Sequence, residues 1–210
     1  MTVILYTRCK QLETLDNNEK LSRLSQAMRI KNGNYRRWQD AHAHLYGKLL
    51  LEVGLKYLGI KKSLKDLMVS EYGKPYFNNQ SFSFNISHSE DYIACVISKE
   101  EKNNLGIDLE KIKPIAFNAF ENIWTEKEKQ SLINLKQFYI YWTRKEAIIK
   151  GDGRGMQIPL NEIDVTKLEV AIGEKLYYLK HIVFDNEYEM HIASVTKLTQ
   201  VDLIQYSFGT

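Results

Sequence analysis

The chain has 210 residues, enough for one large domain or two small ones that bury a hydrophobic core. Its composition, 44% hydrophobic and 26% charged, is that of a folded protein, and a net charge of +3 is too small to indicate nucleic-acid binding. Cys9 and Cys95 show neither metal-site spacing nor a disulfide framework, and no apolar run approaches the roughly 20 residues that span a bilayer. We therefore expect a soluble cytoplasmic protein with reduced thiols and with no nucleic-acid or membrane partner.

The first half of the chain predicts a mixture of helices and strands. In chain order, the expected elements are a strand at 2–7, a helix at 14–30, a turn at 31–34, a helix at 35–58, a turn at 71–76, and strands at 82–86 and 92–98. The longer helix has apolar side chains at three- and four-residue spacing, the pattern of a packed helix. These side chains are Trp38, Ala41, Leu45, Leu49 and Val53.

The second half repeats this order of a helix followed by strands. We expect a strand at 105–110, a short helix at 116–123, a helix that starts at Thr125, a long helix at 137–150, and antiparallel strands from 158 to the end. Thr125 and Glu128 have the spacing of a capping box. The order predicts an α+β fold of two similar lobes that join near residue 104, with a site between them.

The segment 142–150 (WTRKEAIIK) contains the first candidate site residues. On a helix, Trp142, Glu146 and Lys150 share one face, and Gly151 suits a left-handed helix cap. An ordinary surface salt bridge between Glu146 and Lys150 is one interpretation. The apolar run beside them indicates a mostly buried helix instead, and a buried charged pair requires a charged partner.

Asp108 and Glu110 are two residues apart on a predicted strand, so both side chains point to the same side of the sheet. A strand end whose acids face water is the simpler interpretation. Together with Glu146, however, the two residues supply three carboxylates to an oxygen-rich site that suits Mg²⁺. Lys150, one turn beyond Glu146, would then face an anion held by the metal.

The segment 85–89 (NISHS) ends a strand in small polar residues that offer donors to a phosphate, although such residues are often purely structural. Neither a Walker-type phosphate loop nor a nucleophile elbow is present in the sequence. Ser87 and His88 do not suggest a hydrolase dyad, because neighbours along a strand face opposite ways.

Four segments occur in a recognisable order and spacing: GKP at 73–75, FNISHS at 84–89, LGIDLEKI at 105–112 and WTRKEAIIK at 142–150. Together they resemble the surfactin-synthetase type of 4′-phosphopantetheinyl transferase. The family hallmark is a Gly-x-Asp strand followed by a Trp/Phe-Ser/Thr-x-Lys-Glu-Ala-x-x-Lys helix. The resemblance extends from about Glu19 to Leu160.

The resemblance implies two pseudo-symmetric α+β lobes, 1–104 for the coenzyme A nucleotide and 105–210 for the metal-binding acids and the catalytic helix, with the active site at their interface. It implies Mg²⁺ held by Asp108, Glu110 and Glu146. The remaining implied roles are phosphate contact for Lys150, a place near the reacting centre for Glu128, and coenzyme A binding for Lys74, Ser87 and His88.

One position departs from the family pattern. The family has Asp-x-x-Arg at the start of the first long helix, where the arginine helps to hold the 3′-phosphate of coenzyme A. Here the segment reads Asp40-Ala41-His42-Ala43, so the arginine is missing. The candidates for the missing charge are Lys31, Arg36, Arg37 and His44.

The expected activity is Mg²⁺-dependent transfer of 4′-phosphopantetheine from coenzyme A to a serine of an apo acyl or peptidyl carrier protein, with release of adenosine 3′,5′-bisphosphate. Either Glu146 or Glu128, directly or through a water, would accept the serine proton. We expect a monomer, since one chain supplies both lobes. Two alternatives remain open: a coenzyme A-binding relative without activity, and an Mg²⁺ phosphohydrolase that needs no protein acceptor.

A carrier-docking surface is expected beside the metal strand. Residues 116–123 place Ala116, Phe117, Phe120 and Ile123 on one helical stripe, which is either core or a partly exposed contact for an apolar helix of the carrier. Lys111 and Lys113 would then face acidic side chains of that partner.

Overall fold

The structure, a computed structural model, describes residues 1–8, 18–101 and 104–208. The first half contains β1 (Thr2–Arg8), α1 (Asn18–Ser22), α2 (Gln26–Gly33), α3 (Trp38–Tyr57), β2 (Leu67–Val69), β3 (Pro75–Phe77), β4 (Ser83–Ser89) and β5 (Tyr92–Ser98). The second half contains β6 (Leu105–Lys111), α4 (Glu126–Ser131), α5 (Leu135–Asp152), β7 (Glu169–Ile172), β8 (Lys175–His181), β9 (Tyr188–Ser194) and β10 (Val201–Gln205). Short 3₁₀ turns lie at Leu64–Asp66, Phe117–Ile123, Gly155–Gln157 and Leu160–Glu162.

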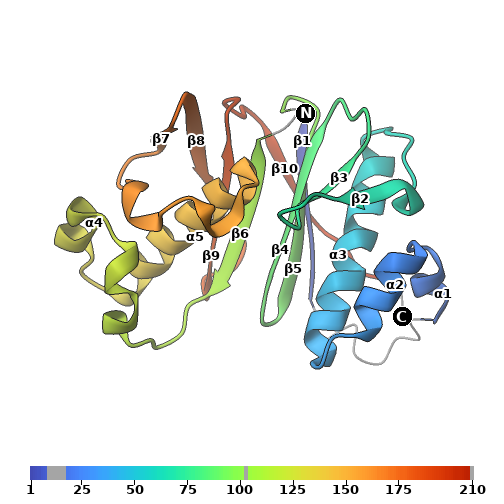
Figure 1. The fold of residues 1–210 in the computed structure, drawn as a ribbon, viewed down its shortest axis with the longest axis horizontal. Coiled ribbons are helices and arrows are strands. Elements are labelled where there is room, and N and C mark those ends of the chain that lie inside the picture. The colour runs from blue at the N-terminus through green and yellow to red at the C-terminus, as the bar shows by residue number, and fades with distance from the viewer. Residues whose placement is uncertain (9–17, 102–103, 209–210) are drawn as a thin grey trace.

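Figure 1 shows four layers, with α3 on one outer side, two four-stranded sheets in the middle and α5 on the other outer side. The strand order is β10-β1-β5-β4 in the first sheet and β6-β9-β8-β7 in the second, while β2 and β3 form a separate pair. One buried apolar cluster joins α3 to the first sheet, another joins α5 to the second, and a third fills the space between the sheets. This arrangement of helices and mainly antiparallel strands confirms the expected α+β class.

The two sheets meet along their edge strands β4 and β6. Side chains of β4 take the place of a neighbouring strand, because Asn85 Oδ1, Ser87 Oγ and Ser89 Oγ accept the backbone N–H groups of β6. The three donors are Ile107, Leu109 and Lys111, at distances of 3.1, 3.4 and 3.2 Å. Polar side chains of β4 therefore satisfy the backbone N–H groups at the edge of β6. A hydrogen-bonded neighbouring strand would not place these side chains beside the acids of β6.

Gly106 allows α5 to approach β6 closely. A Cβ atom at this position would lie 1.9 Å from the carbonyl oxygen of Ala147 and 2.4 Å from the backbone nitrogen of Gly151, which no side chain tolerates. Close packing of α5 against β6 therefore requires a glycine at this position of the Gly-x-Asp motif. It brings the last turns of α5 against the strand that carries Asp108.

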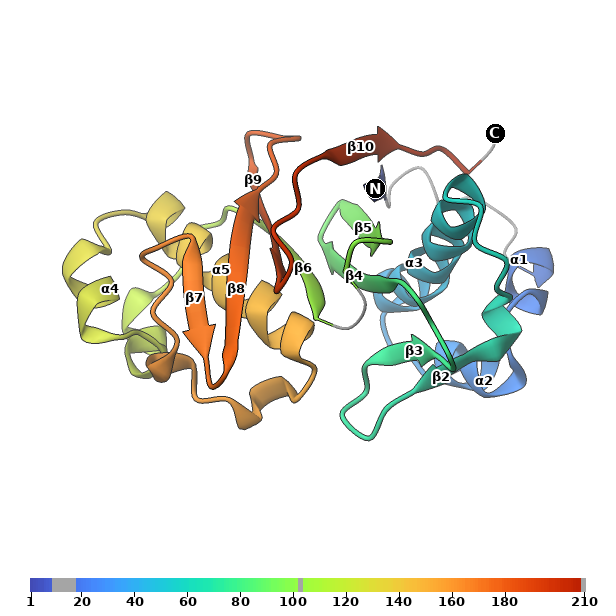
Figure 2. The same ribbon diagram turned by 90° about the horizontal axis from the view of Figure 1, so that it is seen from above.

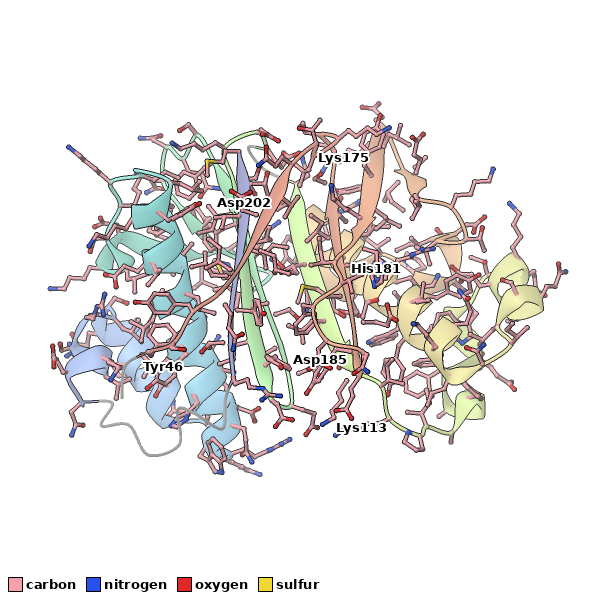
Figure 3. The ribbon with its side chains drawn as sticks, turned by 180° about the vertical axis from the view of Figure 1, so that it is seen from behind. Tyr46, Lys113, Lys175, His181, Asp185 and Asp202 are labelled. Atoms are coloured by element: carbon pink, nitrogen blue, oxygen red, sulfur yellow. The ribbon has the colours of Figure 1, made fainter. Side chains whose placement is uncertain are left out.

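The last strand differs from expectation. The sequence pattern predicted a closing antiparallel sheet from residue 158 to the end, but β10 pairs in parallel with β1 in the first sheet. Figure 2 shows β10 extending from the second half over to the first, and in Figure 3 Asp202 of β10 lies apart from His181 of β8. An apolar run does not encode its partner, so its pairing depends on the tertiary structure. The division into 1–104 and 105–210 remains a prediction, and by strand pairing residues 201–205 belong with the first sheet.

Three local predictions were wrong in detail. The expected helix over 14–30 is two helices, α1 and α2, for the residues from 18 onward, while 14–17 lie outside the described residues. The turn expected at 31–34 falls largely within α2, because the helix continues to Gly33. The long second helix continues past Gly151, and Gly153, with φ of 90°, forms its left-handed cap. None of the described helices is both long and apolar enough to cross a membrane.

Candidate active site

Asp108 on β6 is the centre of the candidate site. Its carboxylate is 2% exposed; its Oδ1 lies 2.5 Å from Lys150 Nζ on α5 and accepts a 2.9 Å hydrogen bond from the Ser87 hydroxyl on β4. Lys150 also donates to Ser87 Oγ at 3.0 Å. Burial raises the pKa of Asp108, and Lys150 opposes that shift. Ser87 of the first half therefore contacts both members of an ion pair that lies within the second half.

Glu110 and Glu146 complete the predicted set of acids. Ser89 Oγ donates to Glu110 Oε2 at 2.7 Å, repeating two residues further along β4 the contact that Ser87 makes with Asp108. Burial and the nearby Asp108 raise the pKa of Glu110 to about 7, against which a Trp142 hydrogen bond acts. Burial and Asp108 likewise raise the pKa of Glu146. The predicted face of α5 thus lies opposite the predicted face of β6.

The arrangement of these acids suits a hard divalent cation. Burial raises the pKa values of all three carboxylates, Asp108 adds to this for Glu110 and Glu146, and the nearby Lys150 only partly opposes it. Oδ2 of Asp108 is buried without a hydrogen-bond partner in the described structure, which is a position for a missing ligand. Oxygen ligands of this kind are those that Mg²⁺ prefers. By chemical type these residues fit the metal that the family resemblance implies, although their three carboxylates do not all come within 4.8 Å of one another in the described structure.

A second cluster has the residue types of a metal site but different electrostatics. Within the described residues, only His181, Glu189 and His191 bring three such ligand atoms within 4.8 Å of one another. Arg144 Nε lies 3.4 Å from His191 Nε2, and Lys136 Nζ lies 3.7 Å from Glu189 Oε1. The positive charges of Lys136 and Arg144 already offset the buried carboxylate of Glu189. The cluster is therefore a network of charged and polar side chains that connects α5 to β8 and β9.

A pocket of about 310 Å³ opens beside the ion pair. Its lining comes from both halves of the chain and includes Gly73, Lys74, Ile86, Glu146 and Lys150. Lys74 donates to the carbonyl oxygen of Gly151 at 2.7 Å, and burial lowers its pKa to about 8. Lys74 and Lys150 therefore line the same pocket, while the role of Lys74 in binding a nucleotide stays a prediction.

A second, basic pocket of about 360 Å³ shares Gly73 and Pro75 with the first. Its polar lining includes Lys31, His44 and Lys48, without any carboxylate. Lys31 and His44 were candidates for the missing charge, whereas Lys48 was not recognised from the sequence. Its position one turn after His44 on the same predicted helix was the available signal.

The other candidates for the missing charge lie elsewhere. Arg36 and Arg37 precede α3, are exposed, and do not line either of these pockets. Ala43, where the family resemblance expects an arginine, is 3% exposed within the core beneath α3. A guanidinium at this position would enter the apolar core, so the charge has to come from another side chain.

Ser87 and His88 alternate across β4 as expected, but their surroundings differ. Ser87 is buried and its hydroxyl already contacts Asp108 and Lys150, so it orients these groups and has no free face for coenzyme A. His88 keeps exposed surface on the other side of the strand, and partial desolvation of its ring, together with Lys150, lowers its pKa. Lys48 acts on His88 in the same direction, whereas Asp40 and Asp108 oppose it.

Glu128 does not lie in an accessible site. The side chain is fully buried, pairs with the equally buried Lys145 at 2.8 Å, and forms the predicted capping box with Thr125. Its other oxygen accepts the backbone N–H of Val165 at 2.9 Å. A fully satisfied carboxylate without exposed surface cannot receive a proton from a protein substrate, so the structure does not support the predicted catalytic role.

The chain is similar to known 4′-phosphopantetheinyl transferases. Residues 104–196 match the family model of the 4′-phosphopantetheinyl transferase superfamily, which covers β6, α5 and the second sheet. The chain is 27% identical over 214 residues to the 4′-phosphopantetheinyl transferase Sfp of Bacillus subtilis strain 168, covering 95% of this chain and 94% of that protein. A further 4′-phosphopantetheinyl transferase of Bacillus subtilis is 26% identical, with 88% of each chain covered.

The similarity is higher, but shorter, to the 4′-phosphopantetheinyl transferase gsp of Aneurinibacillus migulanus, at 36% identity over 61% of this chain and 56% of that protein. The matched region contains the acids of β6 and α5 that form the candidate site. The second half of the chain thus matches the 4′-phosphopantetheinyl transferase superfamily, and the chain as a whole is similar to 4′-phosphopantetheinyl transferases such as Sfp.

Proposed function

We propose that the protein transfers 4′-phosphopantetheine from coenzyme A to a serine hydroxyl of an apo-carrier protein. The observation that carries the proposal is the convergence of Asp108, Glu110, Glu146 and Lys150 beside a pocket lined by both halves of the chain. Phosphoryl transfer depends mainly on positioning and charge neutralisation, which these groups supply. The serine oxygen forms a bond to the β-phosphorus, and the bond to adenosine 3′,5′-bisphosphate breaks.

Asp108, Glu110 and Glu146 would hold Mg²⁺, which when bound neutralises charge on the pyrophosphate. Lys150 already pairs with Asp108, and its pKa is raised by that carboxylate despite burial. With a cation on the acids, its ammonium group is available to the pyrophosphate oxygens. Lys74, which lines the same pocket, would provide a second positive group for the nucleotide.

Glu146 is the better candidate for the base. It lines the pocket, whereas Glu128 is enclosed by its own partners. We propose that Glu146, directly or through a water, accepts the serine proton as the new bond forms.

The carrier would approach from the 3₁₀ turn at Phe117–Ile123. Phe117 is 39% exposed, whereas Phe120 packs against Phe138 and Trp142 at centroid distances of 5.1 and 6.0 Å. Phe117 is therefore the better contact for an apolar helix of the carrier. Lys111 and Lys113 already pair with Asp91 and Glu90, so any attraction to an acidic carrier has to compete with these pairs.

The test is to incubate the protein with coenzyme A, Mg²⁺ and a panel of apo acyl and peptidyl carriers, and to measure intact carrier masses. We expect a phosphopantetheine adduct, its loss in excess chelator, and a rate at least about 100-fold lower for Asp108→Asn, since a metal ligand is worth several kcal/mol. Asp202→Asn on the remote strand β10 is the matched control.

Each alternative predicts a different result in this assay. A phosphohydrolase releases adenosine 3′,5′-bisphosphate without a carrier, and a binding module leaves both coenzyme A and carrier unchanged. Undiminished carrier modification in excess chelator would contradict the metal-dependent chemistry. Monomeric or oligomeric state is read independently from the mass in solution, for which we propose a monomer.

A further inference from the structure

The acids of the candidate site all lie in the second half of the chain, but one of them, Glu110, is held from the first half. Ser89 is the last residue of β4, and its hydroxyl donates to Glu110 Oε2 at 2.7 Å. The same hydroxyl oxygen accepts the backbone N–H of Lys111 at 3.2 Å. Because an amide N–H can only donate, the hydrogen of the Ser89 hydroxyl is free for the carboxylate. Ser89 therefore holds both the side chain of Glu110 and the backbone that follows it.

The turn between β4 and β5 fixes the position of Ser89. Ser89 pairs with Tyr92 across the two strands, so that Glu90 and Asp91 form a tight turn directly after it. The carboxylate of Asp91 lies 3.3 Å from Lys111 Nζ, which ties this turn to the end of β6. The serine hydroxyl is therefore presented to the acids of β6 by a hairpin that is itself anchored to that strand.

Glu110 differs from Asp108 in how its charge is held. Lys150 pairs with Asp108 at 2.5 Å, whereas no ion pair of Glu110 is found among the residues that the structure describes. Its carboxylate accepts hydrogen bonds from Ser89 and from the Trp142 indole, two neutral donors from opposite halves of the chain. Neutral donors orient a carboxylate without cancelling its charge, as they do for carboxylates that ligate metal ions.

Ser89 is also the more specific of the two serines that face these acids. Ser87 makes the corresponding contact with Asp108, but it accepts a hydrogen bond from Lys150 as well. Of the three acids, Ser89 contacts Glu110 alone in the described structure. A change at Ser89 therefore acts on a single one of the expected metal ligands.

On the basis of the proposed function, we propose that Ser89 is a positioning residue for the metal ligand Glu110, supplied by the half of the chain that contributes no ligand of its own. The hydroxyl touches neither the cation nor the reacting atoms. It sets the direction of the Glu110 carboxylate, so that metal affinity depends on how the β4–β5 hairpin lies against β6. Loss of such a hydrogen bond to a ligand lowers metal affinity by about 10–100-fold.

The test is a titration of the full chain with Mn²⁺, a spectroscopic substitute for Mg²⁺, in the presence of coenzyme A and without a carrier. Electron paramagnetic resonance measures free Mn²⁺, so the readout does not depend on activity. We expect Asp108→Asn to abolish binding at this site and Ser89→Ala to weaken it by about 10–100-fold. Ser89→Thr, which keeps the hydroxyl, should restore most of the affinity. Ser131→Ala is the matched control, because it removes a hydroxyl of α4 that contacts Tyr141 at 2.8 Å and none of the acids.

A second measurement separates positioning from a general loss of structure. Ser89→Ala also leaves the backbone N–H of Lys111 without its acceptor, so urea unfolding is measured for each variant. In the carrier assay, the Mg²⁺ concentration that gives half-maximal activity should rise in Ser89→Ala by about the same factor as the Kd for Mn²⁺. At saturating Mg²⁺ its kcat should return close to the wild-type value. A merely structural defect would lower kcat at every Mg²⁺ concentration.

The outcomes distinguish this inference from the proposed function. Wild-type protein without Asp108-dependent Mn²⁺ binding would contradict the proposed function itself. Unchanged Mn²⁺ affinity in folded Ser89→Ala would overturn only the role of Ser89. An equal loss of affinity in Ser89→Thr would assign the effect to packing of the hairpin and would also overturn the role of the hydroxyl. Loss in Ser89→Ala with recovery in Ser89→Thr would support it.

Discussion

The ammonium group of Lys150 lies 2.5 Å from Oδ1 of Asp108, and this pair joins the last turns of α5 to β6. Ser87 contacts both partners, so β4 of the other sheet is held at the same point. Asp108 and Lys150 are 42 residues apart in the sequence. They come into contact because Gly106 lets the helix pack closely against the strand. The predictions below concern this packing, the buried charges and the basic pocket.

Gly106→Ala should destabilise the fold and lower activity together. The added Cβ would lie 1.9 Å from the backbone oxygen of Ala147, and backbone cannot rotate away as a side chain does. Overpacking of this kind costs about 1–3 kcal/mol, a shift of several degrees in Tm for a protein of this size. Gly33→Ala is the control, since a Cβ there meets nothing within 4 Å. Equal melting temperatures for both variants would show that α5 adjusts without cost.

Glu128→Gln should affect stability without affecting the chemistry. Removing one charge leaves Lys145 buried and unpaired, which costs about 3–5 kcal/mol in the free energy of unfolding, measured with urea. We expect kcat/KM of the folded fraction, and its pH profile, to remain normal. Glu126→Gln removes an exposed partner of Lys129 on the same helix and should change stability by less than about 1 kcal/mol. A lost limb of the pH profile in Glu128→Gln would restore its predicted role as base.

Discrimination between coenzyme A and dephospho-coenzyme A should fall as the pH rises. Lys48 in the free protein has a pKa near 8, so it is largely charged at pH 7 and largely neutral at pH 9. Only the charged form attracts a phosphate dianion, and the ratio of the two affinities should fall about tenfold between these values. Lys31, His44, His88 and Cys95 are the other titratable groups that face this region. Lys48→Arg should remove this pH dependence, because a guanidinium stays charged. If the ratio of the two affinities falls equally in this variant, a group other than Lys48 is responsible for the titration.

His44 should contribute to acid destabilisation. Its folded pKa of about 3 lies below the unfolded value of about 6.5, so below pH 6.5 the unfolded chain binds more protons than the folded one. Stability is therefore lost as the pH falls, by up to about 1.4 kcal/mol per pH unit between these two values. Urea unfolding at pH 6.5 and 5 measures this slope. His44→Gln should show a smaller loss than wild type, and an equal loss would contradict the buried neutral imidazole.

The sequence by itself predicted the α+β class, most helices and strands, and the faces that carry the candidate acids. These features depend on local spacing: residues two apart on β6 share a side, and residues four apart on α5 share a face. The capping box of Thr125 and Glu128 was predicted for the same reason, since its partners are three residues apart. The contact of Ser89 with Glu110 was missed, although the alternation of Asn85, Ser87 and Ser89 along β4 was a local signal.

The tertiary structure alone decided which faces meet and which charges are buried. It paired β10 with β1, enclosed Glu128 with Lys145, and placed Ala43 in the core. It also brought Lys31 and Lys48 from two helices to one pocket. Desolvation and charge compensation depend on groups from distant parts of the chain, so no spacing along the sequence specifies them.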